Sequence, residues 1–173
     1  MADLDLTGIV LVGGASTRFG SPKALARLGA DTLAERAWRV LGEVCAERVA
    51  VGAVDGLPFP TVPDPQTGPV AAIAAGLRAA TREVAVVIPV DMPLLNADAL
   101  RTLAGACRDA AVGQQGPLPC AVVRRALPAF ERGERRLRFV LNTLDTSRVR
   151  LDELVLANVN TPEELERLGA TPA

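Results

Sequence analysis

The sequence has no histidine and no tyrosine, and its one tryptophan and four phenylalanines make aromatic residues only 3% of the 173 positions. The absence of histidine excludes a Ser-His-Asp triad, and without a Cys-x-x-Cys pair the common zinc ligand sets are excluded as well. A metal ion in this protein would therefore be a hard cation held by carboxylate oxygens. Hydrophobic residues still make up 49% of the chain, so we expect a core built mostly from Ala, Val and Leu.

Cysteine and long apolar runs are also scarce. Cys45, Cys107 and Cys120 are scattered and odd in number, which favours reduced thiols in a cytoplasmic protein over a disulfide framework. No apolar run reaches the roughly 18 residues of a membrane span, and residues 1–5 lack the basic start of a signal peptide. The formal net charge of −1 gives no global basic field, which disfavours nucleic acid and membranes as partners.

Short apolar segments alternate with stretches of helical periodicity, and this pattern predicts an α/β fold with a mostly parallel sheet and helices on both faces. We expect a single domain over residues 1–173. The expected strands are residues 7–12, 48–51, 83–88, 120–123, 149–151 and 154–159, with a short edge strand within 57–65. The expected helices are residues 32–44, 69–80, 97–109, 126–132 and 134–144, with a last helix after Thr161, and residues 113–119 are expected to form a loop.

The stretch from residue 11 to residue 23 reads Leu-Val-Gly-Gly-Ala-Ser-Thr-Arg-Phe-Gly-Ser-Pro-Lys and follows a short apolar run. Glycines let the backbone approach a ligand, and Arg18 and Lys23 add fixed positive charge, as in loops that bind phosphate. The stretch does not end in the Gly-Lys-Ser/Thr of a Walker A loop, and the adjacent Gly13 and Gly14 do not fit Rossmann spacing. A nucleoside triphosphate loop and a plain strand-to-helix turn both fit the composition.

Two aspartates fall where ligands bind in open α/β sheets, at the carboxyl ends of strands. Asp91 closes the expected strand 83–88 between two prolines, and we interpret it as a Mg²⁺ ligand rather than a helix cap, because Asn96 already stands at the start of the next helix. Asp64 precedes a Gly68-Pro69 turn. It could contact the nucleotide or form an Asx turn, and the sequence favours neither.

Two polar groups lie later in the chain. Asn158 and Asn160 flank the end of the last expected strand and could line a pocket or serve as turn residues. Arg135 and Arg136 belong to a basic helix, which is typical of a solvated face but would also suit an anionic second substrate.

Taken together, these residues resemble the MobA-type nucleotidyltransferases, the molybdenum cofactor guanylyltransferases. The resemblance extends over nearly the whole chain in the right order, and the closing segment is its most particular part. The matching segments are Leu-Val-Gly-Gly-Ala-Ser-Thr-Arg-Phe-Gly-Ser-Pro-Lys (11–23), Asp64, Gly-Pro-Val-Ala-Ala-Ile (68–73), Pro-Val-Asp-Met-Pro (89–93), the segment 117–125, Gly-Glu-Arg-Arg (133–136) and Asn-Val-Asn-Thr-Pro-Glu-Glu-Leu (158–165).

The resemblance implies a Rossmann-like three-layer sandwich of the nucleotide-diphospho-sugar-transferase type. It implies transfer of GMP from MgGTP to molybdopterin or molybdenum-molybdopterin, with release of pyrophosphate and with other molybdenum cofactor biosynthesis proteins as partners. Because the attacking group is itself a phosphate, the reaction needs positioning and charge neutralisation rather than a strong base. The implied GTP-binding residues are Leu11, Val12, Gly13, Gly14, Lys23, Asp64 and Asp91; the catalytic residues are Arg18, Lys23 and Asp91; Asp91 holds Mg²⁺; and Asn158, Asn160, Arg135 and Arg136 face the pterin.

Three positions depart from the family pattern. Val12 stands where the family usually has Ala, Ala72 where it usually has Gly, and Gly52 where some members have an Asn that touches the nucleotide. These differences leave open a cytidylyltransferase that uses CTP, or a nucleotidyltransferase that acts on a sugar phosphate. A non-catalytic nucleotide-binding module is the alternative from a different class.

Overall fold

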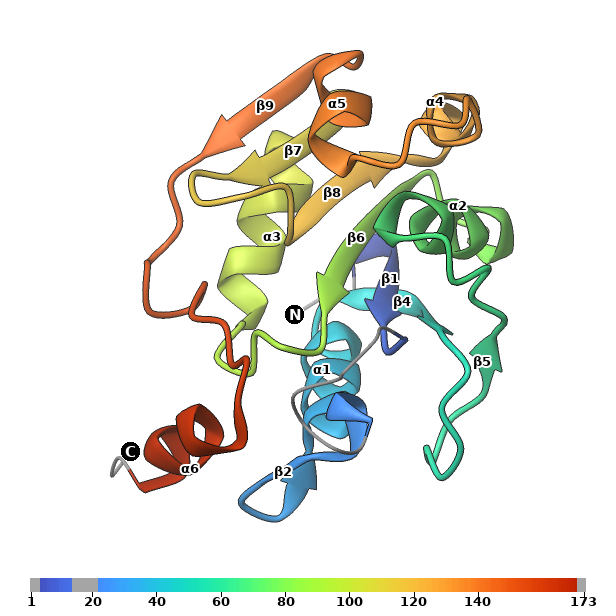
Figure 1. The fold of residues 1–173 in the computed structure, drawn as a ribbon. Coiled ribbons are helices and arrows are strands. Elements are labelled where there is room, and N and C mark those ends of the chain that lie inside the picture. Colours follow the sequence, from blue (N-terminus) through green and yellow to red (C-terminus); the bar gives the residue numbers. More distant parts are fainter. Residues whose placement is uncertain (1–3, 14–21, 171–173) are drawn as a thin grey trace.

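The computed structural model describes residues 4–13 and 22–170, whose elements surround one central sheet (Figure 1). Its spatial order is β5-β4-β1-β6-β8-β7-β9. All neighbouring pairs are parallel except those of β8, which is antiparallel to both β6 and β7. The strands are β1 (Leu4–Leu11), β4 (Cys45–Val51), β5 (Thr61–Val62), β6 (Val84–Pro89), β7 (Ala110–Gly113), β8 (Cys120–Val123) and β9 (Thr146–Val149), and β2 (Arg27–Leu28) and β3 (Asp31–Thr32) form a separate hairpin.

The helices begin where local sequence signals favour a start. Thr32 caps α1 in a capping box, since its hydroxyl accepts from the Glu35 amide at 3.1 Å and the Glu35 carboxylate accepts from the Thr32 amide at 2.7 Å. The Asn96 side chain caps α3 by accepting from the Ala99 amide at 2.9 Å. The α-helices are α1 (Leu33–Gly42), α2 (Pro69–Ala79), α3 (Ala97–Ala106), α4 (Leu127–Phe130), α5 (Leu137–Asn142) and α6 (Pro162–Ala170), with short 3₁₀ turns at η1 (Lys23–Leu25) and η2 (Arg124–Ala126).

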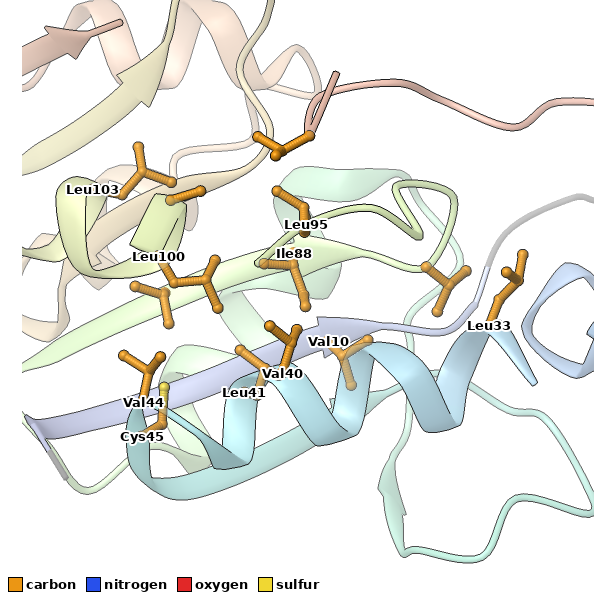
Figure 2. Packing of buried hydrophobic residues seen from close by; sticks show 14 of the residues in the cluster. Val10, Leu33, Val40, Leu41, Val44, Cys45, Ile88, Leu95, Leu100 and Leu103 are labelled. Carbon is orange, nitrogen blue, oxygen red and sulfur yellow. The ribbon is translucent and has the colours of Figure 1, made fainter. Parts of the chain in front are cut away.

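Helices cover both faces of the sheet, as the alternating pattern predicts. On one face, α1 and α3 place Leu41 and Leu100 against Val10 and Ile88 in a continuous apolar layer (Figure 2). The second apolar cluster joins α2, α4 and α5 to the other face. Each buried aliphatic side chain contributes about 1.5–3 kcal/mol to folding. Two such layers hold the sheet mainly through aliphatic side chains, with Phe130 as the one buried aromatic residue in the described part of the chain.

Small residues set how closely the helices approach. A Cβ atom at Gly76 of α2 would lie 2.7 Å from Cγ2 of Ile9, and one at Gly8 of β1 would lie 2.8 Å from Cδ2 of Leu41. Because real Cβ contacts are longer than this, α1 and α2 pack against β1 at distances that only glycine permits at these two positions. The strand β1 is therefore packed closely against a helix on each of its two faces.

One aromatic pair ties the segment after β4 to the first helix. The rings of Trp38 in α1 and Phe59 are stacked with centroids 4.2 Å apart. The guanidinium group of Arg48, a residue of β4, lies 4.6 Å from the centroid of the Trp38 ring. Stacked aromatic pairs contribute about 0.5–1.5 kcal/mol beyond their buried area. The stack holds the connection that leads to β5 and then to Asp64.

The predicted α/β class, the mostly parallel sheet and the helices on both faces are confirmed. The strands near the C-terminus differ from expectation. Residues 154–159 contain no strand, and the strand expected at 149–151 lies earlier, as β9. Neither a helix nor a strand is expected for residues 110–112, and with residue 113 of the expected loop they form β7. Leu156 and Val159 are buried, so the apolar pattern there arises from packing against the core without sheet pairing.

Candidate functional site

The carboxyl ends of β1, β4 and β6 meet at one edge of the sheet. Leu11 is paired with Val51 of β4 on one side and with Pro89 of β6 on the other. The segments that follow these strands therefore start side by side, and they carry Gly13, Gly52 and Asp91. This is the edge at which open α/β sheets bind their ligands.

The first part of the edge is a close contact between Gly13, Gly52 and Asp64. The amides of Val12 and Gly13 both donate to the carbonyl of Val51, at 2.9 and 3.2 Å. A Cβ atom at Gly13 would lie 2.7 Å from Oδ2 of Asp64, and a Cβ atom at Gly52 would lie 2.5 Å from the amide nitrogen of Gly13. Gly52 also has a φ of +151°, which favours glycine. The backbone thus passes directly beside the Asp64 carboxylate.

The structure answers the question of whether Asp64 forms an Asx turn. Its Oδ1 accepts a hydrogen bond from the Gln66 amide at 2.8 Å, which is the Asx arrangement. Its other oxygen, Oδ2, is the atom that faces Gly13. The turn therefore orients a carboxylate toward the end of β1.

The second part of the edge is an ion pair between Lys23 and Asp91. Nζ of Lys23 lies 3.5 Å from Oδ2 of Asp91, and their side chains are 16% and 29% exposed. Lys23 begins the short turn η1, and Asp91 follows the buried strand β6. Asp91 is not a helix cap, since Asn96 fills that role for α3. The lysine of the glycine-rich stretch thus meets the aspartate of β6 across the sheet edge.

Lys23 is the only lysine of the chain, and arginine supplies the other 18 basic residues. Lysine offers a compact ammonium with rotatable donors, whereas arginine offers a rigid planar fork. The one lysine of the chain thus lies at the sheet edge beside Asp91, and its singularity is visible in the sequence.

The C-terminal segment returns to the same edge. The amide of Val159 donates to the backbone carbonyl of Asp91 at 2.8 Å, so Asn158 and Asn160 flank the residue that holds Asp91, and both are exposed. The Glu164 carboxylate accepts from the Asn160 amide at 2.6 Å, and Thr161 caps α6 by accepting from the Glu164 amide at 3.2 Å. Both asparagines are therefore fixed beside the end of β6 by backbone contacts.

Arg135 and Arg136 lie in the exposed segment before α5, not within a helix as expected. The carbonyl of Arg135 lies 3.9 Å from where a Cβ atom at Gly68 would be, which brings this segment to the start of α2 (Figure 1). The Glu134 carboxylate accepts from the Arg136 amide at 2.7 Å, and the Arg136 guanidinium lies 5.3 Å from the Phe139 ring centroid. The guanidinium group of neither arginine forms an ion pair with a carboxylate among residues 4–13 and 22–170.

Gly14 and Arg18 lie outside the described residues. In the described part of the chain, no group of three or more His, Cys, Asp or Glu side chains could hold a metal ion. Mg²⁺ needs no such group, because it usually keeps several waters and takes one or two carboxylates plus phosphate oxygens. The partly exposed Asp91 carboxylate beside a lysine fits a Mg²⁺ that enters with a triphosphate.

Burial disfavours thiol chemistry at Cys107 and Cys120. Desolvation raises the pKa of Cys120 to about 12 and that of Cys107 to about 11, so neither forms the reactive thiolate near neutral pH. Both are free thiols. The chemistry of the edge therefore belongs to its carboxylates, its lysine and its backbone amides.

A mostly parallel sheet with helices on both faces and polar groups gathered at its carboxyl edge defines an α/β domain of the nucleotide-binding kind. Within the described residues, none of the helices has the length and hydropathy of a membrane span. The chain belongs to the family described as the MobA-like NTP transferase domain, which it matches over residues 8–150. The family resemblance inferred from the sequence motifs is thereby confirmed.

Two relatives and one solved structure illustrate the likeness. The chain is 33% identical to a molybdenum cofactor guanylyltransferase of Xanthomonas euvesicatoria over 177 residues, covering 94% of this chain and 93% of that one. It is 41% identical to a probable molybdenum cofactor guanylyltransferase of Mycobacterium tuberculosis over 111 residues, which cover 57% of this chain and only 55% of the relative. The molybdopterin-guanine dinucleotide biosynthesis protein A of Archaeoglobus fulgidus superposes with a TM-score of 0.77 at 24% identity, covering 93% of this chain and 95% of that one, and so shows the shared fold.

Proposed function

We propose that this protein is a molybdenum cofactor guanylyltransferase, a single-domain enzyme that transfers GMP from MgGTP to molybdopterin or molybdenum-molybdopterin. The family and the relatives' names support this activity. The observation in the structure that carries the proposal is the Lys23–Asp91 pair at the carboxyl edge. It puts one cation and one carboxylate beside the strand ends where a nucleoside triphosphate would lie.

The reaction has a simple atom balance. A phosphate oxygen of the acceptor attacks the α-phosphorus of GTP, a new P–O bond forms, and the bond from that phosphorus to the bridging oxygen breaks to release pyrophosphate. The nucleophile is already anionic, so no general base is required. The work that falls to the protein is alignment of the two phosphates and neutralisation of developing charge.

Each part of the edge has a role in this proposal. Lys23 binds the triphosphate, aided by Arg18, and donates to the oxygens that gain charge as pyrophosphate leaves. Asp91 would hold the Mg²⁺, which would neutralise negative charge on the phosphates. Before the nucleotide enters, Lys23 and Asp91 balance each other's charge, so neither is left as an isolated charge at the half-buried edge.

The nucleoside side and the acceptor side lie to either side of this pair. Leu11, Val12, Gly13 and Gly14 would bind the nucleoside through backbone groups, with Oδ2 of Asp64 directed at the same point. Asn158, Asn160, Arg135 and Arg136 would face the pterin acceptor. A side chain at Gly52 would collide with the backbone of Gly13, so position 52 offers no side chain to the base. The proposal gives the contacts with the nucleoside to the backbone and Asp64.

The test is pyrophosphate release from GTP, CTP, ATP and UTP, each with no acceptor, with molybdopterin and with a sugar phosphate. We expect release with GTP that depends on molybdopterin. Release with CTP instead would make the protein a cytidylyltransferase, and release that requires a sugar phosphate would also replace the proposed acceptor. GTP binding without any release would leave a non-catalytic nucleotide-binding module.

The roles of the pair are tested by Asp91→Asn and Lys23→Met, which remove charge with little change in shape. Each should lower the transfer rate about a hundredfold or more, in line with the loss of one electrostatic contact to the transition state. Asp98→Asn is the matched control, because this carboxylate on α3 is 92% exposed and should not affect the rate. A near-normal rate for Asp91→Asn with Mg²⁺ would remove the metal assignment.

The single lysine allows a second readout that does not depend on turnover. Pyridoxal phosphate, an anionic aldehyde, should form an imine with Lys23 that borohydride reduces to a stable adduct, detected by peptide mass. MgGTP should protect Lys23 better than MgCTP does, because a ligand that occupies the site excludes the reagent. Labelling that no triphosphate prevents would place Lys23 outside the nucleotide site.

A further inference from the structure

A hollow of about 250 Å³ lies away from the Lys23–Asp91 pair, between the segment 114–117, α5 and β9. The buried Val112 and Leu141 form its floor. The exposed side chains of Arg138, Asn142 and Arg148 form its rim. More of the lining is polar than apolar, so the hollow suits a ligand that carries several polar groups.

The spacing of the lining residues explains why they share this hollow. Arg138, Leu141 and Asn142 lie three and four positions apart on α5 and so occupy one face of that helix. Thr146 and Arg148 lie two positions apart on β9 and so point to the same face of the sheet. The register pairs Val112 of β7 with Arg148 of β9, which brings floor and rim together.

The loop that closes the hollow is fixed by the side chain of Gln114. Its Nε2 donates to the carbonyl of Leu151 at 2.7 Å, and its Oε1 accepts from the amide of Leu151 at 3.0 Å. The side-chain amide thus forms the two hydrogen bonds that the backbone of a neighbouring strand would make with Leu151. These bonds anchor the loop to the segment that continues to Asn158 and Val159. A rim held in this way does not have to be ordered when a ligand binds.

The charge of the region indicates an occupant rich in hydrogen-bond acceptors. Residues 124–150 contain eight arginines and three acidic residues, a formal charge of +5, in a chain whose formal net charge is −1. Arg125 is paired with Glu83 and Asp109. Arg138 and Arg148 have no carboxylate within ion-pair distance among residues 4–13 and 22–170. Their guanidinium groups are available to bind a planar anion with paired hydrogen bonds or to stack on a ring.

We propose that this hollow binds the heterocyclic end of the acceptor, a planar pterin-type ring system with polar edges. The inference rests on the proposed function, which supplies such an acceptor. β7 is two positions from β6 in the sheet order, which corresponds to about 10 Å at ordinary strand spacing. A fused ring system carrying a phosphate arm spans a comparable length. Because β6 and β7 are both antiparallel to β8, their carboxyl ends lie at the same edge of the sheet. The proposal places the ring in the hollow and directs its phosphate arm along this edge toward Asp91.

A binding measurement with unsubstituted pterin, a fluorescent ring system without a carboxylate, tests the assignment at 0.15 M salt. The double variant Arg138→Ala/Arg148→Ala should bind at least tenfold more weakly than the unaltered protein, because hydrogen bonds to charged groups contribute that much or more. Arg124→Ala is the matched control, an exposed arginine outside the hollow, and it should bind as the unaltered protein does. An unchanged melting temperature shows that the variants are folded.

Kinetics give the second readout. With molybdopterin as acceptor, the double variant should raise the acceptor KM at least tenfold and leave kcat and the thermal shift with MgGTP within about twofold. Equal pterin binding and equal KM in the variant and the unaltered protein would overturn the assignment. An equal loss in Arg124→Ala would overturn it too, since only general charge would then be acting.

The two proposals fail in different ways. If pterin binding depends on Arg138 and Arg148 but no triphosphate yields pyrophosphate, the hollow stands as a pterin site and the guanylyltransferase proposal falls. If transfer from GTP proceeds at the same acceptor KM in the double variant, the enzyme assignment stands and the hollow has no part in acceptor binding.

Discussion

Gly52 is the position at which a single methyl group should most disturb the site. In Gly52→Ala the new Cβ would lie 2.5 Å from the amide nitrogen of Gly13 and 2.8 Å from Cγ2 of Val12, where ordinary contact begins at 3.4 Å. The nitrogen belongs to the backbone, so no side-chain rotation relieves the collision. The end of β1 must therefore move away from β4, and the hydrogen bonds to Val51 must lengthen.

The size of the effect follows from two separate costs. Holding a residue with a side chain at a φ of +151° costs about 1–3 kcal/mol, and forcing an extra carbon into a packed contact costs about 1–3 kcal/mol more. Gly56→Ala separates the two, because Gly56 has a φ of +86° and no atom within 4 Å of its added Cβ. Gly52→Ala should thus be less stable than Gly56→Ala by about 1–3 kcal/mol.

Urea unfolding followed through Trp38, the single tryptophan, measures this difference. At a slope of about 2 kcal/mol/M, an extra 2 kcal/mol lowers the midpoint of Gly52→Ala by about 1 M relative to Gly56→Ala. MgGTP should also raise the melting temperature of Gly52→Ala less than that of the control, because Gly13 and Asp64 are displaced. Equal midpoints and equal GTP shifts in the two variants would refute the idea that Gly52 maintains the nucleoside end of the site.

Two further predictions concern the sheet itself. Thr7→Val removes the 2.5 Å hydrogen bond that the buried Thr7 hydroxyl donates to Glu47. Burial raises the pKa of Glu47, but hydrogen bonds from Thr7 and Thr81 outweigh burial and lower this pKa overall. A carboxyl group with a lowered pKa stabilises the fold above the ordinary value of 4.5, and this stabilisation is lost as the pH falls below that value. Thr7→Val should therefore lower the free energy of unfolding by about 1–3 kcal/mol at pH 7 and by less towards pH 3, as measured by urea titration. A loss of stability that does not change with pH would contradict this. Gly76→Ala should lower the unfolding midpoint although alanine has the better helix propensity, because the new Cβ would collide with β1. In Gly105→Ala on α3 the new Cβ has no atom within 4 Å, so this control should be more stable than the unaltered protein by about 0.5–1 kcal/mol. A change of stability with the same sign in both variants would show that close helix packing does not decide the outcome.

Features that depend on neighbouring residues could be predicted from the sequence. The capping roles of Thr32 and Asn96 follow from side chains three residues before the amides they bind, and the buried strand before Asp91 follows from an unbroken apolar run. The strand β7 could not be predicted, because Ala110–Gly113 is short and gains its strand character by pairing with β8 and β9. The reverse error at residues 154–159 has the same origin, since burial there is not accompanied by backbone pairing.

The candidate site divides along the same line. Lys23 and Asp91 could be brought together in advance, because a loop after one parallel strand and an aspartate after its neighbour must share an edge. The hollow could not be predicted from the sequence, because Arg138 and Arg148 belong to elements whose relative placement depends on the pairing of β7 with β9. The hydrogen bond between the backbones of Val159 and Asp91 could not be predicted either, because a bond between two backbone groups does not depend on the type of the residues that form it.

That contact also orders events during synthesis. The ribosome synthesises the chain from its N-terminus at about 5–20 residues per second. The carbonyl of Asp91 cannot accept its hydrogen bond from the amide of Val159 until that residue is added, 68 residues later. Until then the end of β6 lacks one of its backbone anchors, although Lys23 and Asp91 have both been made. The nascent chain can thus hold the residues that would bind MgGTP before the edge that presents them is fixed, and truncated versions that end near residue 150 should resemble that unfinished state.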